Sequence, residues 1–569
     1  MRLLTLFSLL LLTVAGLQAQ NTRHIIRFTD KKGTLHSLAS PSSFLSARAI
    51  DRRTKQQLTI DSTDLPLSAA YLDSIRKIPN VTILNVSKWF NQVLISTIDA
   101  AALVKINSYP FVKQTTAIAP RLAPTGNTLP IDKFSEEAKV MPVPTNFSNR
   151  QTNVTGLNDL NYGNTFQQVH IHEGDYLHDL GFTGRNVVIA IIDAGFKSYK
   201  TNPAFDSVRL QNRVLGEWDF VANETSVNED DAHGANCFSI IAANRPGILV
   251  GSAPHASFWL LRSEAPGEFP VEEQNWAAAA EFADSVGADM ISSSLGYIDF
   301  DAPFNTAEYN HSYAQRNGNT ALVTRAADLA AKKGILVVNS AGNNGNLTTD
   351  AKFIACPADG DSVLAVAATD VNGNIASFSS WGPSGDGDVK PNVASVGLAT
   401  VYANSAGNAV AGNGTSYACP NLCGLIACLW QAFPEFNNMQ IIDAVQKSSS
   451  KYNVPDNRFG YGIPNFRKAY ASLQQQRDAQ TLNNKWIKVY PVPFIGSFSI
   501  TLKAPVSGKA TFRLTDALGR LIETKEMQIS AGQVYIIDFP RANYLAKAVY
   551  YVHYSDGTNK QTVQLVKGK

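Results

Sequence analysis

Three short segments of the chain carry the residue types that nucleophilic attack by a serine needs. Asp193 ends an apolar run, His233 precedes a glycine, and Ser416 follows Gly414-Thr415. A serine hydroxyl becomes a nucleophile when a histidine takes its proton, and a carboxylate fixes the tautomer of that histidine and stabilises its charged form. Taken singly, these residues are typical of a turn, a packed histidine and a helix cap. Their order and their contexts together favour a catalytic triad.

The elements around these residues alternate between strand and helix patterns. Continuously apolar strands suit a parallel sheet that is covered on both faces, and active sites of open α/β sheets lie at the carboxyl ends of the strands. We therefore expect a mostly parallel open sheet flanked by helices, with Asp193 at its functional edge. The predicted strands are Val187–Asp193, Phe258–Leu261, Met290–Leu295, Ile335–Ala341 and Leu364–Thr369; the predicted helices are Asn236–Ala243, Val271–Val286, Ala321–Lys333 and Ser416–Trp430.

The region from about Tyr176 to Ala471 resembles the subtilase family of serine peptidases. Val187–Gly195 is similar to the family's aspartate block, His233-Gly234-Ala235-Asn236 to its histidine block, and Gly414–Gly424 to its serine block. The histidine block departs from the family pattern at two positions outside the triad, where alanine and asparagine replace threonine and histidine. The resemblance implies a subtilisin-like fold and a secreted endopeptidase that hydrolyses peptide bonds in protein and peptide substrates.

The same resemblance assigns further residues to the site. Ala341-Gly342-Asn343 is similar to the family's Ala-Gly-Asn segment, which implies that the Asn343 amide donates to the oxyanion of the tetrahedral intermediate. Ser294-Leu295-Gly296 is similar to the strand end where an extended substrate pairs by backbone bonds. Ala355 would lie at the base of the primary specificity pocket, where a small residue favours an apolar substrate side chain.

No cofactor is assigned from the sequence. His170, His172 and His178 are close in sequence, but no further ligands complete a metal site at a familiar spacing. Subtilases often bind calcium, yet no Asp-rich loop locates a site. Of the five cysteines, Cys419, Cys423 and Cys428 lie on one predicted apolar helix and are interpreted as buried small hydrophobic residues, with pairing of Cys237 left open.

The chain divides into five predicted parts. A positive start and an apolar run that is too short to span a bilayer predict a signal peptide cut after Ala19; no later stretch predicts a membrane span. The N-terminal α/β unit resembles a subtilase propeptide, which implies that the chain is a zymogen; a plain structural domain is the alternative. The parts are a signal peptide (1–19), a propeptide-like domain (20–118), a linker (119–165), the peptidase domain (166–475) and a β-sandwich (484–569).

The β-sandwich resembles the sorting domains of type IX secretion. Val489–Phe494 is similar to their Tyr-Pro-x-Pro opening, and Asp516–Arg520 to their Asp-x-x-Gly-Arg turn. The resemblance implies that secretion machinery is a partner and that the protein is secreted or held at the cell surface. A carbohydrate- or protein-binding sandwich is the alternative, because a fold alone does not give a function.

Two other classes of function are weighed against a peptidase, one on the charge balance and one on the residues of the site. The chain has 49 basic and 47 acidic residues, a net charge of +2, which gives no reason to expect nucleic acid as a partner. The alternative to an active peptidase is a catalytically dead relic that serves as a surface binding protein. Such a relic is expected to lose one of Asp193, His233, Ser416 or Asn343, and all four are present.

Overall fold

The computed structural model describes residues 22–118, 133–134, 137, 139–143, 160–481 and 485–568. The predicted signal peptide lies outside these residues. The chain divides into two compact units between Phe466 and Arg467. Among the described residues, no helix is both long enough and apolar enough to cross a bilayer.

The N-terminal domain is an antiparallel sheet in the order β2-β3-β1-β4. Successive side chains of a strand point to opposite faces, and both faces are apolar here because both are covered. Ile26 packs in the domain's own core with Ile75 of α2, whereas its neighbour Ile25 packs with Trp276 of the peptidase domain. The elements are β1 (Arg23–Phe28), α1 (Ala47–Lys55), α2 (Ala69–Arg76), β2 (Thr82–Ser87), β3 (Gln92–Ser96), α3 (Ala100–Asn107) and β4 (Val112–Ile118).

The peptidase domain is built on a seven-stranded parallel sheet in the order β13-β12-β11-β10-β5-β9-β6. The five predicted strands are confirmed, and two strands were not predicted. β6 contains Gly216 and Glu217, which interrupt its apolar pattern at the sheet edge, and β13 has only four residues. The strands are β5 (Val188–Asp193), β6 (Val214–Asp219), β9 (Ser257–Arg262), β10 (Met290–Ser293), β11 (Leu336–Ser340), β12 (Val363–Thr369) and β13 (Val393–Val396).

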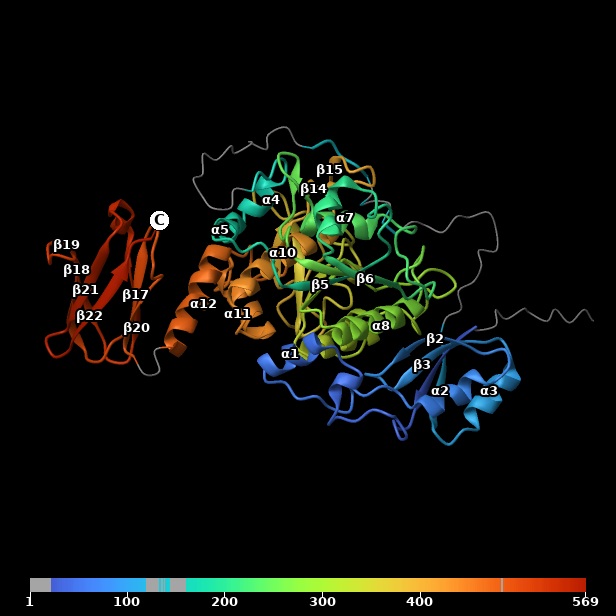
Figure 1. The fold of residues 1–569 in the computed structure, drawn as a ribbon. Coiled ribbons are helices and arrows are strands. Elements are labelled where there is room, and N and C mark those ends of the chain that lie inside the picture. Colours follow the sequence, from blue (N-terminus) through green and yellow to red (C-terminus); the bar gives the residue numbers. More distant parts are fainter. Residues whose placement is uncertain are drawn as a thin grey trace, which may run out of the picture. The chain divides into compact units, whose positions relative to one another are not determined.

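Helices cover both faces of this sheet, as the pattern predicts. Figure 1 shows α7 (His233–Ala242) and α8 (Val271–Val286) on opposite sides of β5 and β6. α9 (Leu322–Lys332) packs beside α8, and α10 (Thr415–Ala432) packs beside α7. Short elements complete the domain: α4 (Phe166–His170), α5 (Gly174–Asp179), α6 (Asp206–Leu210), β7 (Asn244–Arg245), β8 (Leu249–Val250), β14 (Thr400–Ala403), β15 (Ala409–Gly412) and α11 (Asn438–Ser448).

The interpretation of the cysteines as buried hydrophobic residues is confirmed. All five thiols are free and buried. α10 carries three of them, Cys419, Cys423 and Cys428, in the core of the peptidase domain.

The second unit holds two antiparallel sheets, β16-β17-β20 and β19-β18-β21-β22. They enclose one core that includes Phe498, Phe512 and Val552. β19 was not predicted, because its alternating exposed and half-buried residues include charged side chains at an edge. The elements are α12 (Phe466–Thr481), β16 (Ile487–Tyr490), β17 (Phe498–Lys503), β18 (Gly508–Asp516), β19 (Leu521–Ile529), β20 (Val534–Phe539), β21 (Val549–Ser555) and β22 (Lys560–Val566).

The Asp-x-x-Gly-Arg segment of this unit is a turn that closes on itself. Asp516 accepts hydrogen bonds from the backbone N–H groups of Leu518 and Arg520, both at 2.9 Å, and from the Arg520 side chain at 2.6 Å. Gly519 has φ +79°, which favours glycine. The spacing of the motif therefore has a structural reason within the turn.

Candidate active site

Alternation along β5 places Asp193 on the face of the sheet where α7 and α10 begin. Val188, Ala190 and Ile192 pack with the residues of α8 and α9, so Asp193 points to the opposite face. It is fully buried, and its Oδ1 lies 2.7 Å from Nδ1 of His233. The carboxylate thus fixes the ring so that Nε2 faces the cleft.

The backbone on either side of His233 holds this pair together. Asp231 accepts from the His233 N–H at 2.7 Å. A Cβ at Gly234 would lie 2.4 Å from the carbonyl oxygen of Gly195 and 2.8 Å from Cβ of Asp193. The glycine after the histidine is therefore required for α7 to approach β5 so closely.

The environment makes the imidazole of His233 basic. Burial by itself lowers the pKa of His233, but the charge and hydrogen bond of Asp193 outweigh it, so the pKa lies well above its usual value. Burial raises the pKa of Asp193, and its interaction with His233 counteracts part of this rise. A histidine beside a buried carboxylate can accept a proton and remain stable in its charged form.

Ser416 lies at the start of α10, where the helix dipole favours negative charge. Its Oγ lies 3.2 Å from the carbonyl oxygen of Ser294, and its own carbonyl accepts from Ser294 Oγ at 2.8 Å. These reciprocal bonds fix the position of the serine relative to the end of β10.

The amide of Asn343 is oriented by the residue before the serine. Asn343 Oδ1 accepts from the backbone N and from Oγ1 of Thr415, both at 2.9 Å. Thr415 Oγ1 also accepts from the backbone N of Gly342 at 3.1 Å. Because the oxygen of the amide is engaged in this way, its NH₂ group faces the cleft as a donor.

A cavity of about 310 Å³ adjoins these groups. Ser416 and Asn343 line it, and so do the residues that the resemblance assigned to substrate binding: Ser294, Leu295, Gly296 and Ala355. A Cβ at Gly296 would lie 2.8 Å from Cβ of Ala355, so these two residues lie next to each other in the lining of the cavity.

A carboxylate from the predicted linker lies in the centre of the site. Glu137 Oε1 accepts from Ser416 Oγ at 3.0 Å and from Asn343 Nδ2, and Glu137 Oε2 lies 3.0 Å from Nε2 of His233. Tyr417 OH donates to the Glu137 carbonyl at 3.2 Å. Within the described part of the chain, Ser416 and His233 both bond to this carboxylate, and no hydrogen bond joins the two side chains.

The neighbours of Glu137 extend along the cleft on both sides, and we call Lys133, Phe134, Glu137 and Met141 the cleft segment. The Phe134 ring stacks on the His233 ring at 3.8 Å and 15°. Met141 pairs with Ala411 of β15 by two antiparallel backbone bonds of 2.8 and 3.0 Å. Sequence reasoning treated residues 119–165 as a linker and missed these contacts, since they join positions far apart in the chain and leave no local pattern.

The three histidines near the start of the domain have separate partners. His172 bonds to Ser395 and His178 to Tyr162, and burial lowers the pKa of each to about 4. His170 pairs with Asp175 at 2.9 Å. They do not converge on one point, and among the described residues the oxygen donors that suit calcium lie elsewhere: Glu264, Glu268 and Glu272, and the exposed Asp361, Asp386 and Asp388.

Comparisons with known proteins agree with this architecture. A sequence model of the subtilase family matches residues 184–462, a model of the peptidase S8 propeptide domain of Bacteroidota matches residues 23–130, and a model of the secretion system C-terminal sorting domain matches residues 488–568. The propeptide and the sorting domain make this an exported protein, secreted or at the cell surface. The tail's β-sandwich therefore has a sorting function, and the chain is a zymogen.

Curated relatives match mainly the peptidase domain. Subtilisin DY of Bacillus licheniformis is 30% identical over 303 residues, which cover 52% of this chain and 95% of the relative. Subtilisin E of Bacillus subtilis (strain 168) is 31% identical over 296 residues, with 52% and 68% covered. A solved structure of the prenylagaramide maturation protease PagA aligns with a TM-score of 0.41 and 22% identity, over 53% of this chain and 98% of that chain. Because the family model matches residues 184–462 and the subtilisins match at 30–31% identity, this chain belongs to the subtilase family of serine peptidases.

Proposed function

We propose that Ser416 is the nucleophile, His233 the general base, Asp193 its orienting carboxylate and Asn343 the oxyanion donor of a serine endopeptidase. One observation carries the assignment: Ser416, His233 and Asn343 all bond to the two oxygens of a single carboxylate, that of Glu137. The three groups therefore converge on a volume of the size of one carboxyl group. A substrate carbonyl in that volume would meet a nucleophile, a base and a hydrogen-bond donor at once.

The proposed reaction uses each group in turn. Ser416 Oγ attacks the carbonyl carbon while its proton moves to Nε2 of His233, and the carbonyl oxygen becomes an oxyanion that accepts from Asn343 Nδ2. The imidazolium then gives the proton to the leaving amine, and the C–N bond breaks. Water repeats the sequence on the acyl-enzyme, which releases the acid and restores the serine hydroxyl. Calcium takes no part in these steps. Such an ion would be held by the carboxylate oxygens of Asp361, Asp386 and Asp388.

The substrate is proposed to bind as an extended chain. Ser294, Leu295 and Gly296 lie at the end of β10, where a peptide can pair with backbone groups. Ala355 leaves room in the cavity for an apolar side chain next to the scissile bond. The proposed domain boundaries are those given above, with the propeptide-like domain ending near residue 118 and the peptidase domain starting near residue 166.

A fluorophosphonate probe tests the assignment directly, because it reacts only with a serine that a base has activated. We expect the processed enzyme to be labelled on Ser416 and Ser416→Ala to be neither labelled nor active on casein. The full-length Ser416→Ala chain should fold and be exported like the parent. Labelling at another residue, or casein hydrolysis by Ser416→Ala close to that of the parent, would contradict the proposal.

A further inference from the structure

Three glutamates bring their carboxylates together beside the proposed catalytic residues. Glu264 follows β9, Glu272 lies in the first turn of α8, and Glu268 lies between them in the sequence. One carboxylate oxygen of each lies within 4.8 Å of the other two. Glu264 and Glu268 line the same 310 Å³ cavity as Ser416 and Asn343. The cluster is therefore part of the cleft and is not a separate surface feature.

The peptidase domain satisfies these carboxylates only in part. Glu264 accepts from the hydroxyls of Ser263 at 2.8 Å and Tyr297 at 2.6 Å. Glu272 accepts from two backbone N–H groups, at 2.7 and 2.9 Å. Oε2 of Glu268 is buried and has no hydrogen-bond partner. All of these donors are neutral, so they do not compensate the negative charge of the cluster.

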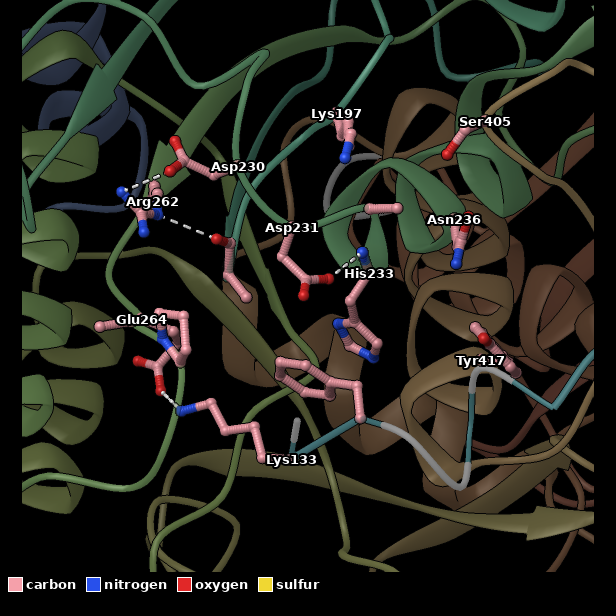
Figure 2. Close-up of a pocket in the computed structure, with 15 residues that line it drawn as sticks. Lys133, Lys197, Asp230, Asp231, His233, Asn236, Arg262, Glu264, Ser405 and Tyr417 are labelled. Atoms are coloured by element: carbon pink, nitrogen blue, oxygen red, sulfur yellow. Dashed lines mark hydrogen bonds and ion pairs between the residues drawn. The ribbon is translucent and has the colours of Figure 1, made fainter. Parts of the chain in front are cut away.

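A cation from the cleft segment supplies the missing charge. Nζ of Lys133 lies 2.5 Å from Glu264, 3.3 Å from Glu272 and 3.4 Å from Glu268, and Figure 2 shows this side chain pointing to Glu264. Burial lowers the pKa of Lys133, but the three carboxylates outweigh it and hold the pKa well above its usual value. The cluster thus already binds one ammonium group, and that group belongs to a segment lying in the cleft.

The cluster is costly without such a cation. Burial raises the pKa of Glu268 to about 7, and burial together with the charge of Glu264 raises the pKa of Glu272 well above its usual value. Removing one partner of a buried ion pair leaves an uncompensated charge, which is strongly destabilising. When the cleft segment leaves the site, the carboxylates would be compensated by protons or by another positive group in the place of Lys133.

The path of the cleft segment shows where that group would come from. Lys133 reaches the glutamates, Phe134 stacks on His233, Glu137 contacts Ser416, and Met141 pairs with β15. The amino-terminal end of the segment therefore lies at the cluster and its carboxyl-terminal end beyond the serine. A substrate bound in the same direction would place the residues upstream of its scissile bond beside the glutamates.

We propose that Glu264, Glu268 and Glu272 form a subsite that binds a lysine or arginine side chain of the polypeptide substrate, upstream of the bond that is cut. The inference rests on the proposed function, because it specifies the substrate of the same cleft. The preferred substrate would then carry two features: a basic side chain at the glutamates and an apolar side chain in the pocket at Ala355. A divalent cation is the competing occupant, since carboxylate oxygens also suit calcium.

Paired quenched peptides test the subsite in the processed enzyme. The two peptides of a pair differ only by lysine or norleucine at one position, and the pairs move that position through the residues upstream of the bond. At one position we expect kcat/KM for lysine to exceed that for norleucine by about 10- to 100-fold, which corresponds to a hydrogen bond to a charged group. Glu268→Gln should lower this ratio by about tenfold, through a loss of kcat/KM for the lysine peptide. Glu268 is chosen because it makes the fewest bonds within its own domain.

Asp299→Asn is the matched control, because Asp299 is an exposed carboxylate that lines the same cavity outside the cluster. It should leave the ratio unchanged. The inference is overturned if no position prefers lysine, if Asp299→Asn lowers the ratio as much as Glu268→Gln, or if calcium abolishes a preference that EDTA restores. A failure of the proposed function looks different: neither peptide is cut, and the probe does not label Ser416.

Discussion

Replacement of Glu137 should release the intact chain from latency. Its carboxylate occupies the volume that we assign to the substrate carbonyl, and it holds the two groups that would react with each other. Glu137→Gln keeps one oxygen, for Ser416 and Asn343, and places an NH₂ group against His233. Glu137→Ala removes all three interactions and keeps the rest of the cleft segment.

The size of the effect follows from the bonds that are lost. A hydrogen bond to a charged group contributes about 1.5–3 kcal/mol, and about 1.4 kcal/mol is a tenfold change in an equilibrium. Glu137→Gln loses one such bond, so it should raise the open fraction about 10- to 100-fold. Glu137→Ala loses three that share one carboxylate and are not additive, and we expect roughly 10²–10³-fold or more. The rate in processed enzyme sets the upper limit.

The assay is the rate at which a fluorophosphonate labels the full-length band on a denaturing gel, which separates intact from processed chains. Glu308→Ala is the control, because Glu308 is exposed and makes none of the contacts with Ser416, His233 and Asn343 described above. The expected order is parent and control slowest, then Glu137→Gln, then Glu137→Ala. If Glu137→Ala labels within about threefold of the parent while processed enzyme labels much faster, Glu137 is not what closes the site.

Four further predictions follow from the same geometry. Asn343→Ala should lower kcat of the processed enzyme about 10²–10³-fold with little change in KM; a change mainly in KM would show that the amide contributes to ground-state binding instead. The raised pKa of His233 means that the active, neutral form is gained as pH rises, so kcat/KM should increase with an apparent pKa above about 6.5; a flat profile from pH 5 to about 9 would exclude His233 as the base. Asp284 bonds to Arg53 at 2.9 Å and also to Arg52. Asp284→Asn in the Ser416→Ala chain should therefore lower the free energy of unfolding by about 3–5 kcal/mol and expose the propeptide to added protease. The control Asp73→Asn, in an exposed ion pair, should change the free energy of unfolding by under about 0.5 kcal/mol. Deletion of residues 485–569 should leave a peptidase that is active but retained in the cell envelope; equal amounts of truncated and full-length enzyme in the medium would refute a sorting role for this domain.

The sequence was sufficient for the elements that carry local patterns. β5 and β12 were predicted because continuous apolar runs are typical of a sheet buried on both faces. The start of α10 was predicted because glycine and serine there precede a long apolar segment. β6 and β19 were not predicted, because an edge strand is partly exposed and keeps polar residues that break the pattern.

The parts of the site that were not predicted depend on contacts between distant positions. Glu137 lies 279 residues before Ser416, and Lys133 lies 131 residues before Glu264. Neither residue sits in a periodic segment, and a polar linker is the ordinary interpretation of such a stretch. A lysine and a glutamate four residues apart give no signal until the fold shows that one reaches a carboxylate cluster and the other a serine.

The cleft segment and the propeptide-like domain make separate contacts with the peptidase domain, and these contacts should fail in order. The cleft segment is held by groups around Ser416, while α1 is held by ion pairs of Arg52 and Arg53 with the buried Asp284. While the chain is intact, Glu137 is presented to the site intramolecularly, which gives it a high effective concentration. Cutting the chain near the cleft removes that advantage, whereas the α1 contacts do not depend on it. Substrate should therefore reach the part of the cleft lined by Glu264 only after the cut segment has diffused away. The propeptide domain should remain bound to the peptidase domain through Asp284 until the propeptide is digested.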